Sequence, residues 1–555
     1  MKLAMKLATI SVPVLAAFVM SPAVAQTPDS TVSVEGGRIL GAAADVAGVT
    51  VYKAVPFAAP PTGSNRWRAP QPVVPWSGVR ESTAWPNRCY QLAAANPPGT
   101  FYFNEFYWDP SRDPKASEDC LYLNIWAPAK PASGSLPVMV FFHGGGNRHG
   151  SNSEVVFNAS KLAAKGVIVV TAAYRLNIMG FLALPGMKDD GAGNFAILDG
   201  VQALKWVNRN IAAFGGDPGR VTIAGQSAGS RNVRTLLSTP LTKGLYRRAI
   251  LHSSPTIMAQ PGKLNYVTLE RKMAEAGPVF EKYFPGRSVD DLRKLPVEEF
   301  YNDPAKVEAL YAVSSGLFAA IDGNVLTFDS VDLLKQGALN GADIMMGTVA
   351  DERTALDGAP GKEMEIPAFH AYWKKQLGEE IYAAYSFERL YPASTPLDGY
   401  GQHLKAQADL LLEQNRIAGS LLTAKNPGSK VYVYYFDHPT PGRDREYYGA
   451  WHSSDLWYTF NSLRHEPGQR QWSPADFELG EQASSLWANF IRTGDPNAEG
   501  LPAWPQSTQS SKGAYLWFAE KSTGASSGSP YFGTSAEGRN ALFHDYQMKY
   551  YGVNW

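Results

Sequence analysis

Short apolar runs alternate along much of this chain with segments whose apolar residues recur every three or four positions. The longest segment of the second kind, between Leu198 and Phe214, predicts an amphipathic helix that ends at the Gly-Gly-Asp-Pro sequence of residues 215–218. Another helix is predicted to extend through Leu237. The apolar runs predict buried strands at residues 138–142, 167–171, 221–224, 249–251, 344–346 and 431–435. Because such strands alternate with helices, the pattern indicates an α/β fold with a large, mostly parallel central sheet flanked by helices.

Two later stretches, near residues 255–335 and 360–430, are more helical and contain fewer strand-like runs. We interpret them as helical insertions that wall a pocket, because no internal repeat or extended linker separates them from the rest of the chain. Residues 26–555 are therefore expected to form a single domain.

The first 25 residues have the composition of a secretory signal peptide. Lys2 and Lys6 precede an apolar stretch, residues 7–20, and the Ala-Val-Ala sequence of residues 23–25 then offers a cleavage site. A membrane anchor is the alternative, but the apolar stretch is shorter than the ~20 residues that a spanning helix needs. We therefore expect residues 1–25 to be removed and the protein to be exported, to the periplasm or the medium, without a stable membrane span.

The charges of the chain balance. Its 555 residues include 51 Lys and Arg and 51 Asp and Glu, a net charge of 51 − 51 = 0, and loss of the two leader lysines would leave 49 − 51 = −2. This balance, with no run of like charges, argues against nucleic acid as a partner and against a polybasic contact with membranes. With 45% hydrophobic residues the chain can bury a large core. The favoured partner is a small or neutral molecule.

Cys89 and Cys120 are the only cysteines in the sequence. In an exported protein, such a pair most simply forms one disulfide that closes a surface loop. Their spacing does not fit a Cys-x-x-Cys metal or redox motif.

A serine with a glycine two residues away on either side, Gly225-Gln226-Ser227-Ala228-Gly229, follows a predicted strand and begins a predicted helix. A sharp turn between strand and helix strains the serine backbone and leaves no room for larger neighbours. The turn presents the hydroxyl near the N–H groups and the positive dipole end of the helix start. An isolated match to this motif would be weak evidence, but the strand and helix around it favour a nucleophilic serine over a structural turn.

A run of glycines, His143-Gly144-Gly145-Gly146, follows another predicted strand. Consecutive glycines let unobstructed backbone N–H groups point at one atom, as a developing alkoxide requires. A flexible loop or a phosphate cradle is the alternative, although the Lys-Ser/Thr of a P-loop does not follow. Beside Ser227, the run predicts an oxyanion hole.

A serine hydroxyl becomes a good nucleophile when a base takes its proton, and the usual base is a histidine held by a carboxylate. In this architecture the chain order is nucleophile, acid, histidine, which excludes His143, His149 and His252. The residues themselves leave six candidates open: His370, His403, His438, His452, His465 and His544.

More specific stretches accompany these motifs, at residues 55–63 (Val-Pro-Phe-Ala-Ala-Pro-Pro-Thr-Gly), 117–124 (Ser-Glu-Asp-Cys-Leu-Tyr-Leu-Asn), 193–199, 214–218 and 493–497. With them, the chain resembles the type-B carboxylesterases, the esterase and cholinesterase branch of the α/β-hydrolases, over nearly its whole length after residue 25. The resemblance implies the α/β-hydrolase fold and the hydrolysis of carboxylic esters.

The resemblance also implies the partners of the serine. Glu352 matches the acid of the family's catalytic triad, and the adjacent Asp351 is its nearest rival. His452 matches the catalytic histidine, with His438 as the rival.

Other residues match supporting positions of the family. Gly145, Gly146 and Ala228 match the three N–H donors of the oxyanion hole. Cys89 and Cys120 match the family's first disulfide loop. The resemblance implies no metal and no organic cofactor.

Five residues near the triad depart from the family pattern, and two of them, Gln226 and Asn147, are candidates for the pocket. Gln226 stands where the family usually has Glu, and Asn147 stands where an aromatic residue is usual. Gln226 removes a negative charge beside the nucleophile, which weakens any preference for cationic esters such as choline esters. Asn147 would make the rim more polar if its side chain faces the pocket. The aromatic segment 101–108, in the loop between the cysteines, either lines the pocket or anchors the loop, and Trp108 is its first pocket candidate.

The sequence thus predicts an exported serine esterase that cleaves small neutral carboxylic esters through an acyl-enzyme intermediate. An amidase or peptidase would use the same residues, and a non-catalytic adhesion protein would share the fold. The intact set of Ser227, Glu352 and His452 argues against the adhesion protein.

Overall fold

The computed structural model describes residues 30–92, 98–109, 111, 114–128, 135–187, 191–254, 266–313, 317–328, 341–357, 360–442, 444–463, 470–519, 523–526 and 541–549. The expected signal peptide, residues 1–25, lies outside the described residues. None of the helices in the described part combines the length and the apolar character that crossing a membrane requires.

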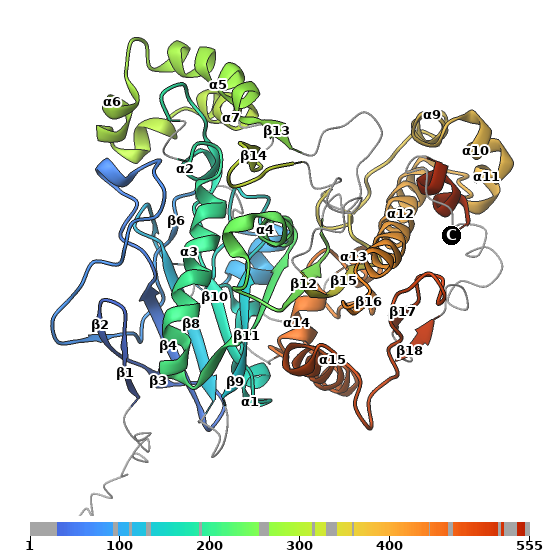
Figure 1. Cartoon of the computed structure of the whole chain (residues 1–555). Helices are drawn as coiled ribbons and strands as arrows, with labels where there is room; N and C mark the ends of the chain where they lie inside the picture. Colours follow the sequence, from blue (N-terminus) through green and yellow to red (C-terminus); the bar gives the residue numbers. More distant parts are fainter. Residues whose placement is uncertain are drawn as a thin grey trace, which may run out of the picture.

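In the described part of the chain, eleven strands form one central sheet (Figure 1). The strands from β17 to β10 run parallel, and the strands at both edges pair antiparallel. This confirms the predicted α/β fold, and all six predicted strands lie in the sheet. The order across it is β18 (Thr523–Ser526), β17 (Tyr515–Ala519), β16 (Val431–Asp437), β15 (Asp343–Val349), β12 (Arg248–His252), β11 (Gly216–Gln226), β9 (Leu136–Phe142), β10 (Ile168–Ala172), β8 (Tyr122–Pro128), β4 (Val49–Pro56) and β3 (Ala42–Ala43).

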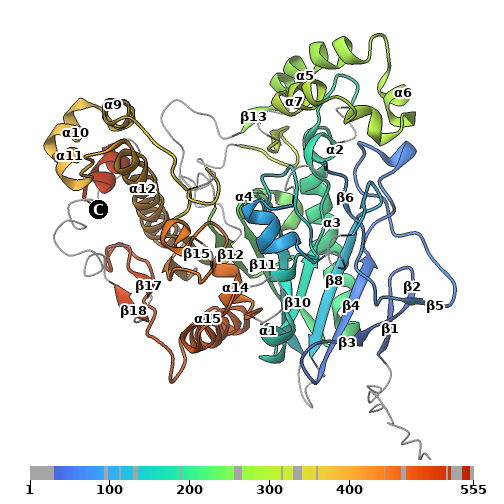
Figure 2. The ribbon, with the colours of Figure 1, turned by 180° about the vertical axis from the view of Figure 1, so that it is seen from behind.

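Helices cover both faces of this sheet. On one face, α3 (Phe195–Asn210) and α4 (Ala228–Ser238) pack over β11, and α12 (Pro396–Lys425) packs on β15 and β16 (Figure 1). On the other face lie α1 (Ser160–Ala164) and α15 (Pro474–Thr493), seen from behind in Figure 2. Strands covered on both faces are buried throughout, which is why β10 is fully buried and apolar at every position except Thr171.

The helix predicted to reach residue 214 ends slightly earlier. α3 stops at Asn210, and the apolar spacing continues through a 3₁₀ turn, Ile211–Phe214. Gly215 then adopts φ 87°, a left-handed conformation that ends the helix at the predicted glycine.

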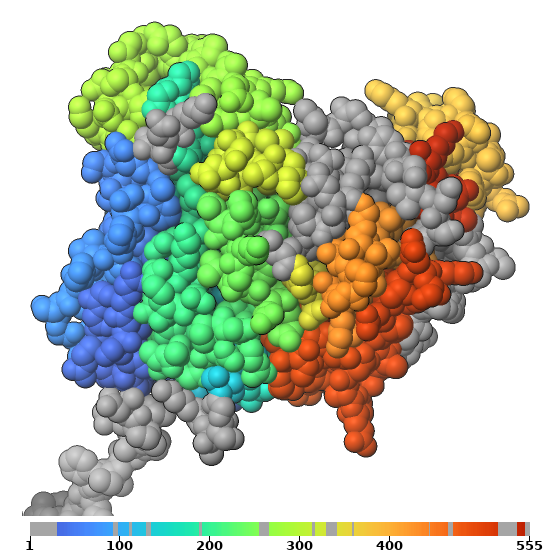
Figure 3. All heavy atoms as spheres, in the orientation of Figure 1, coloured from blue at the N-terminus to red at the C-terminus, as the bar shows by residue number. Residues whose placement is uncertain are grey.

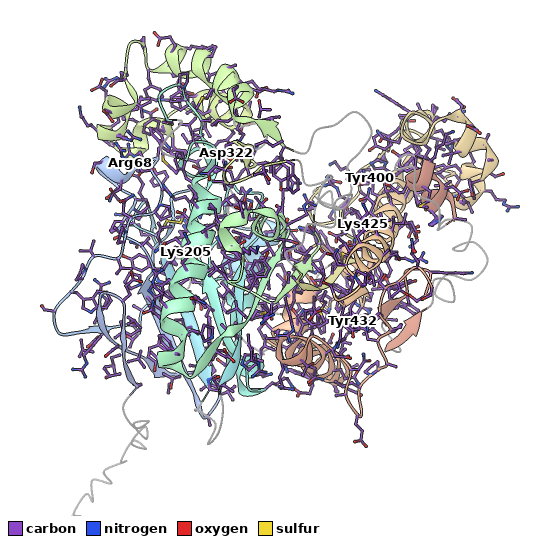
Figure 4. The ribbon with its side chains drawn as sticks, viewed as in Figure 1. Arg68, Lys205, Asp322, Tyr400, Lys425 and Tyr432 are labelled. Carbon is purple, nitrogen blue, oxygen red and sulfur yellow. A yellow bond between two sulfur atoms is a disulfide. The ribbon has the colours of Figure 1, made fainter. Side chains whose placement is uncertain are left out.

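The two helical stretches form separate groups at the upper rim. In Figure 1, α5 (Leu269–Tyr283), α6 (Val289–Lys294) and α7 (Pro304–Ala312) stand on one side, and α9 (Ile366–Leu377), α10 (Glu379–Ala384), α11 (Phe387–Leu390) and α12 stand on the other. Figure 4 labels Asp322 near the first group and Tyr400 in the second. The second group has its own apolar cluster, in which Phe369 and Trp373 pack with Leu542 and Phe543.

Shorter elements complete the described chain. On the face shown in Figure 3, residues of the last quarter (orange and red) pack against those near residues 200–250 (green). The shorter elements are β1 (Thr31–Val34), β2 (Gly37–Leu40), β5 (Val79–Glu81), β6 (Arg88–Cys89), β7 (Ala116–Ser117), β13 (Val267–Thr268), β14 (Ala320–Ile321), α2 (Asn177–Phe181), α13 (Arg445–Tyr448) and α14 (Asp455–Thr459).

Candidate active site

Ser227 occupies the turn between β11 and α4, at the carboxyl edge of the sheet. Its backbone dihedrals, φ 55° and ψ −121°, lie outside the regions that most residues adopt. Its N–H donates to the carbonyl of His252, at the end of the neighbouring strand, at 3.0 Å. A Cβ on Gly225 would lie 2.6 Å from the carbonyl carbon of Gly229, and one on Gly229 would lie 2.2 Å from the carbonyl oxygen of Phe142. The strained turn therefore requires glycine on both sides, as the motif predicts.

The glycines after β9 form a tight loop beside the serine. A Cβ on Gly145, which has φ 101°, would lie 2.0 Å from the carbonyl oxygen of His149. The carbonyl of Gly145 accepts from the N–H groups of Arg148 and His149 at 3.0 and 3.1 Å. The N–H of Gly146 shares that planar peptide and points the opposite way. Among the described residues, the N–H groups of Gly145, Gly146 and Ala228 donate no hydrogen bond, so all three can bind an oxyanion.

Glu352 follows β15 and is almost completely buried. Its Oε1 accepts from the N–H of Val349 at 3.1 Å and from the hydroxyl of Thr348, and its Oε2 contacts Nδ1 of His452. Burial alone would raise the pKa of Glu352. The charge of His452 and its hydrogen bond, together with the hydroxyls of Ser253 and Thr348, nevertheless hold that pKa below its ordinary value. The carboxylate is therefore ionised at neutral pH.

His452 lies in the loop between α13 and α14, which is tied to the loop of the acid. The N–H of Asp351 donates to the carbonyl of Ala450 at 3.0 Å, and the N–H of Ala450 donates to Asp351 Oδ2 at 2.8 Å. The hydroxyl of Tyr102 donates to the carbonyl of His452 at 3.2 Å. Because Nδ1 faces the ionised Glu352, Nδ1 carries the hydrogen and Nε2 has the lone pair. That tautomer can accept a proton from a serine.

A cavity of about 320 Å³ opens over the serine. One wall is aromatic and comes from Tyr102, Phe106 and Tyr107 in the loop between the cysteines. Ala355 and Leu356 also line the cavity, and the 44% exposure of Leu356 places it at the mouth. Among the described residues, neither helical stretch contributes to the walls. The described lining residues come from the segment between the cysteines, from the segments that follow β9, β11 and β15, and from the region of His452. The volume suits a small ligand.

Of the three predicted pocket residues, Gln226 lines the cavity, whereas Asn147 and Trp108 do not. Asn147 is fully buried: its Nδ2 donates to the carbonyl of Leu317, and its Oδ1 accepts from Asn232, both at 2.9 Å. Its φ of 60° is a conformation that Asn adopts more readily than an aromatic residue. Asn147 therefore fastens the glycine loop and leaves the polarity of the cavity unchanged.

One carboxylate that the sequence did not predict as a site residue lines the cavity. Glu154 is 5% exposed, and its Oε1 accepts from the hydroxyl of Tyr107 at 2.7 Å and from the N–H of Ser151 at 3.0 Å. His149 lines the cavity too, and burial, with a smaller effect of the charge on Arg148, lowers the pKa of His149 to about 4. Their only signal in the sequence was their closeness to the glycine run.

The rival residues make contacts elsewhere. Asp351 holds the backbone of the histidine loop, and burial raises the pKa of Asp351 to about 6. His438 Nε2 lies 2.8 Å from Asp476 Oδ1. His465 lies outside the described residues. The other candidates contact different partners: His370 with Tyr382, His403 with Gln407, and His544 with Glu413.

The loop with the aromatic wall is closed by the predicted disulfide. Cys89 and Cys120 are bonded, with their Cα atoms 4.9 Å apart. The ring centroids of Phe101 and Phe106 lie 5.0 and 5.7 Å from that of Trp451, next to the histidine. The aromatic segment therefore both lines the cavity and anchors the loop.

The arrangement places a hydroxyl, an imidazole held by a carboxylate and the N–H groups of Gly145 and Gly146 around one cavity, with the N–H of Ala228 next to the serine. This combination suits nucleophilic attack on a carbonyl group. In the described part of the chain, no group of three or more His, Cys, Asp or Glu side chains is arranged to hold a metal ion.

Comparison with known proteins shows similarity along most of the chain. The sequence profile of the carboxylesterase family matches residues 28–529. A fumonisin B1 esterase from Sphingopyxis macrogoltabida is 32% identical over 501 residues, which are 87% of this chain and 86% of that protein. A para-nitrobenzyl esterase from Bacillus subtilis (strain 168) is 31% identical over 86% of this chain and 93% of that protein. The solved structure of a carboxylesterase from Geobacillus stearothermophilus is similar with a TM-score of 0.72 and 30% identity, over 92% of this chain and 100% of that one.

Proposed function

The chain belongs to the carboxylesterase family and is a carboxylic ester hydrolase, and from this premise we propose that it cleaves small neutral esters through an acyl-enzyme intermediate on Ser227. One observation carries the proposal: the imidazole of His452, held by Glu352, opens into the same cavity as Ser227. Gly145 and Gly146, whose N–H groups donate no hydrogen bond among the described residues, line that cavity too, and Ala228 follows the serine directly.

In the first half of the reaction, Ser227 Oγ bonds to the ester carbonyl carbon while His452 Nε2 takes its proton. The carbonyl oxygen becomes an oxyanion, which the N–H groups of Gly145, Gly146 and Ala228 bind. The bond to the alcohol oxygen then breaks, and the imidazolium protonates the leaving alcohol. In the second half, water attacks the acyl carbon while the imidazole takes its proton. The bond to Ser227 Oγ then breaks, the imidazolium returns the proton to Oγ, and the carboxylic acid leaves.

The mechanism is tested by treating the protein with an organophosphate, mapping the adduct by mass spectrometry, and assaying Ser227→Ala on short aryl esters. We expect an adduct on Ser227 and a loss of kcat of about 10⁴-fold or more in the variant. Ser230→Ala is the matched control, because Ser230 is buried in α4 and does not line the cavity. An unmodified Ser227, or an active Ser227→Ala enzyme, would refute the mechanism.

The preference for neutral esters rests on Gln226, a neutral residue of the cavity wall. The carboxylate of Glu154 also lines the cavity, but its Oε1 accepts from the hydroxyl of Tyr107 and from the N–H of Ser151. We expect the enzyme to favour 3,3-dimethylbutyl acetate over the cationic acetylcholine of the same shape, and Gln226→Glu to shift the ratio toward the cation. A preference for acetylcholine that disappears in Glu154→Gln would show that the neutral assignment is wrong.

An amidase would use the same groups, so a matched ester and amide with one acyl group must be compared. We expect a much higher kcat/KM for the ester, because the alkoxide is the better leaving group. Equal values would favour the amidase.

The same proposal includes export and domain organisation: residues 1–25 are a signal peptide, and residues 26–555 form one α/β domain. The leader pattern of the sequence and the disulfide between Cys89 and Cys120 support export. N-terminal sequencing of protein from the periplasm and medium of an expressing bacterium is expected to begin at Gln26, and retention in the cytoplasm with Met1 in place would contradict export. A single calorimetric transition is expected for one domain, and two separate transitions would contradict it.

A further inference from the structure

Gln226 is the last residue of β11 and immediately precedes the nucleophile. Its side chain is 3% exposed and forms part of the cavity wall. Its Nε2 lies 3.1 Å from Nε2 of His452. This contact joins a residue outside the catalytic set to the nitrogen that must act as the base.

The chemistry of the imidazole determines which way the amide points. The ionised Glu352 accepts a hydrogen bond from Nδ1–H of His452. Nε2 of the neutral imidazole therefore has only a lone pair, and its hydrogen-bond partner must be a donor. The amide nitrogen of Gln226 therefore faces the imidazole, and its oxygen faces the glycine loop. A Cβ on Gly144 would lie 2.4 Å from that oxygen, so the amide is enclosed between the loop and the imidazole.

The amide of Gln226 donates a hydrogen bond to the lone pair of His452 Nε2. The same lone pair must receive the proton of Ser227. Among the described residues, Ser227 Oγ makes no hydrogen bond to His452. We propose, on the basis of the function proposed above, that Gln226 is a positioning residue: its amide holds the neutral imidazole with Nε2 directed into the cavity and yields that lone pair to Ser227 when an ester enters.

This positioning has a consequence for the dependence of activity on pH. A protonated imidazole presents an N–H at Nε2, and the N–H₂ group of Gln226 cannot accept it. Reversing the amide would place that N–H₂ group against Gly144. A carboxylate at position 226 would accept the same hydrogen and add a favourable charge. The wild-type enzyme is therefore expected to keep its active, neutral imidazole to a lower pH than the Gln226→Glu variant would.

Other ionisable groups around the imidazole are the same in all variants of position 226. Their effects on the pH profile therefore cancel when the variants are compared. Of these, Asp351 titrates in the working range, since burial raises its pKa to about 6, whereas the pKa of His149 is lowered to about 4 and that of Tyr102 lies well above 10. The groups that face His452 or line its cavity are Glu352, Tyr102, Tyr107, His149 and Glu154, with Asp351 and Arg353 beside the acid.

The test is a profile of kcat and kcat/KM against pH for an uncharged aryl ester, with wild-type, Gln226→Met and Gln226→Glu proteins. We expect the midpoint of the acid limb to rise in that order, with Gln226→Glu about one pH unit above the wild type. Gln226→Met keeps the length of the side chain but removes the donor, so kcat should fall several-fold with little change in KM. Gln71→Glu, a surface residue, adds the same charge elsewhere and should leave the profile unchanged.

Each rate is divided by the concentration of active sites, which is measured by titration with an organophosphate. A variant that folds poorly is then not mistaken for an inactive one. Coincident acid limbs in all three proteins, an unchanged kcat in Gln226→Met, or an effect on KM alone would overturn the proposal. If those results come with an inactive Ser227→Ala, only the role of Gln226 fails. If Ser227→Ala remains active, the proposed function itself fails.

Discussion

Replacing Glu352 by Gln changes one atom of the side chain, yet the surrounding hydrogen bonds make that atom decisive. Oε1 of Glu352 accepts from the N–H of Val349 and from the hydroxyl of Thr348. A backbone N–H can only donate, so the carbonyl oxygen of the new amide must occupy this place. The amide N–H₂ group is then directed at Nδ1 of His452. Because that group can only donate, the imidazole must present a lone pair at Nδ1 and carry its hydrogen on Nε2.

In the wrong tautomer the imidazole cannot act as the base, and this determines how far kcat falls. Nε2 with a hydrogen cannot take the proton of Ser227, so we expect kcat to fall by about 10³ to 10⁴, equivalent to about 4 to 5.5 kcal/mol of activation free energy. Glu352 does not line the cavity, so KM should change little. Only the chemical step should suffer.

The assay is steady-state hydrolysis of a short aryl ester, followed by release of the coloured alcohol, with folding checked by circular dichroism. Asp351→Asn is the control, because it makes the same chemical change at the adjacent residue. Its amide oxygen can still accept the N–H of Ala450, so its kcat should stay within about tenfold of the wild type. A folded Glu352→Gln protein that is no slower than the control would refute the reasoning about the tautomer.

Three further changes test other parts of the structure. Gly145→Ala should lower kcat by about 10² to 10³, because the new Cβ would lie 2.0 Å from the carbonyl oxygen of His149 and displace the loop; unchanged kinetics would count against the three-donor oxyanion hole. Burial lowers the pKa of Lys272 to about 7, so between pH 7 and 10 the unfolded chain binds more protons than the folded protein. Over this range the free energy of unfolding of the wild type should therefore rise by about 3 kcal/mol relative to that of Lys272→Met. Urea titrations of both proteins at several pH values measure this difference. Reducing the bond between Cys89 and Cys120, which are 31 positions apart, should lower the free energy of unfolding by about 3 to 4 kcal/mol and raise KM, because the aromatic wall belongs to that loop; an unaltered KM would contradict the second effect.

The strands of the central sheet were predictable where the apolar pattern of the sequence matches the burial of the strand in the folded protein. β10 is buried on both faces, and its first three residues, Ile168 to Val170, form a short apolar, β-branched run that is visible in the sequence. The order of the strands was not predictable in this way: β11 lies between β9 and β12, and β8 and β4, toward one edge, pair antiparallel with their neighbours. Pairing across the sheet depends on crossovers and on packing between distant segments, which no local pattern encodes.

In the candidate site, too, local structures were predictable from the sequence and contacts between distant residues were not. The turn at Ser227 and the loop of Gly145 are local structures, and the need for glycine at each is visible in the adjacent residues. The pairing of Glu352 with His452 joins residues 100 positions apart, and the residues alone left six histidines open. Resemblance to the family selected His452, and in the described part of the chain it is the histidine that contacts Glu352.

By itself, the sequence determined the α/β class, the strained serine turn, the glycine loop and the disulfide, because each depends on backbone conformation or on residue chemistry within a short segment. Only the tertiary structure decided the content of the cavity. It buried Asn147 away from the cavity, brought Glu154 into its wall, and placed the amide of Gln226 on the lone pair of His452. Those outcomes depend on distances of a few ångströms between segments far apart in the chain, and such distances are set only when the whole core has packed.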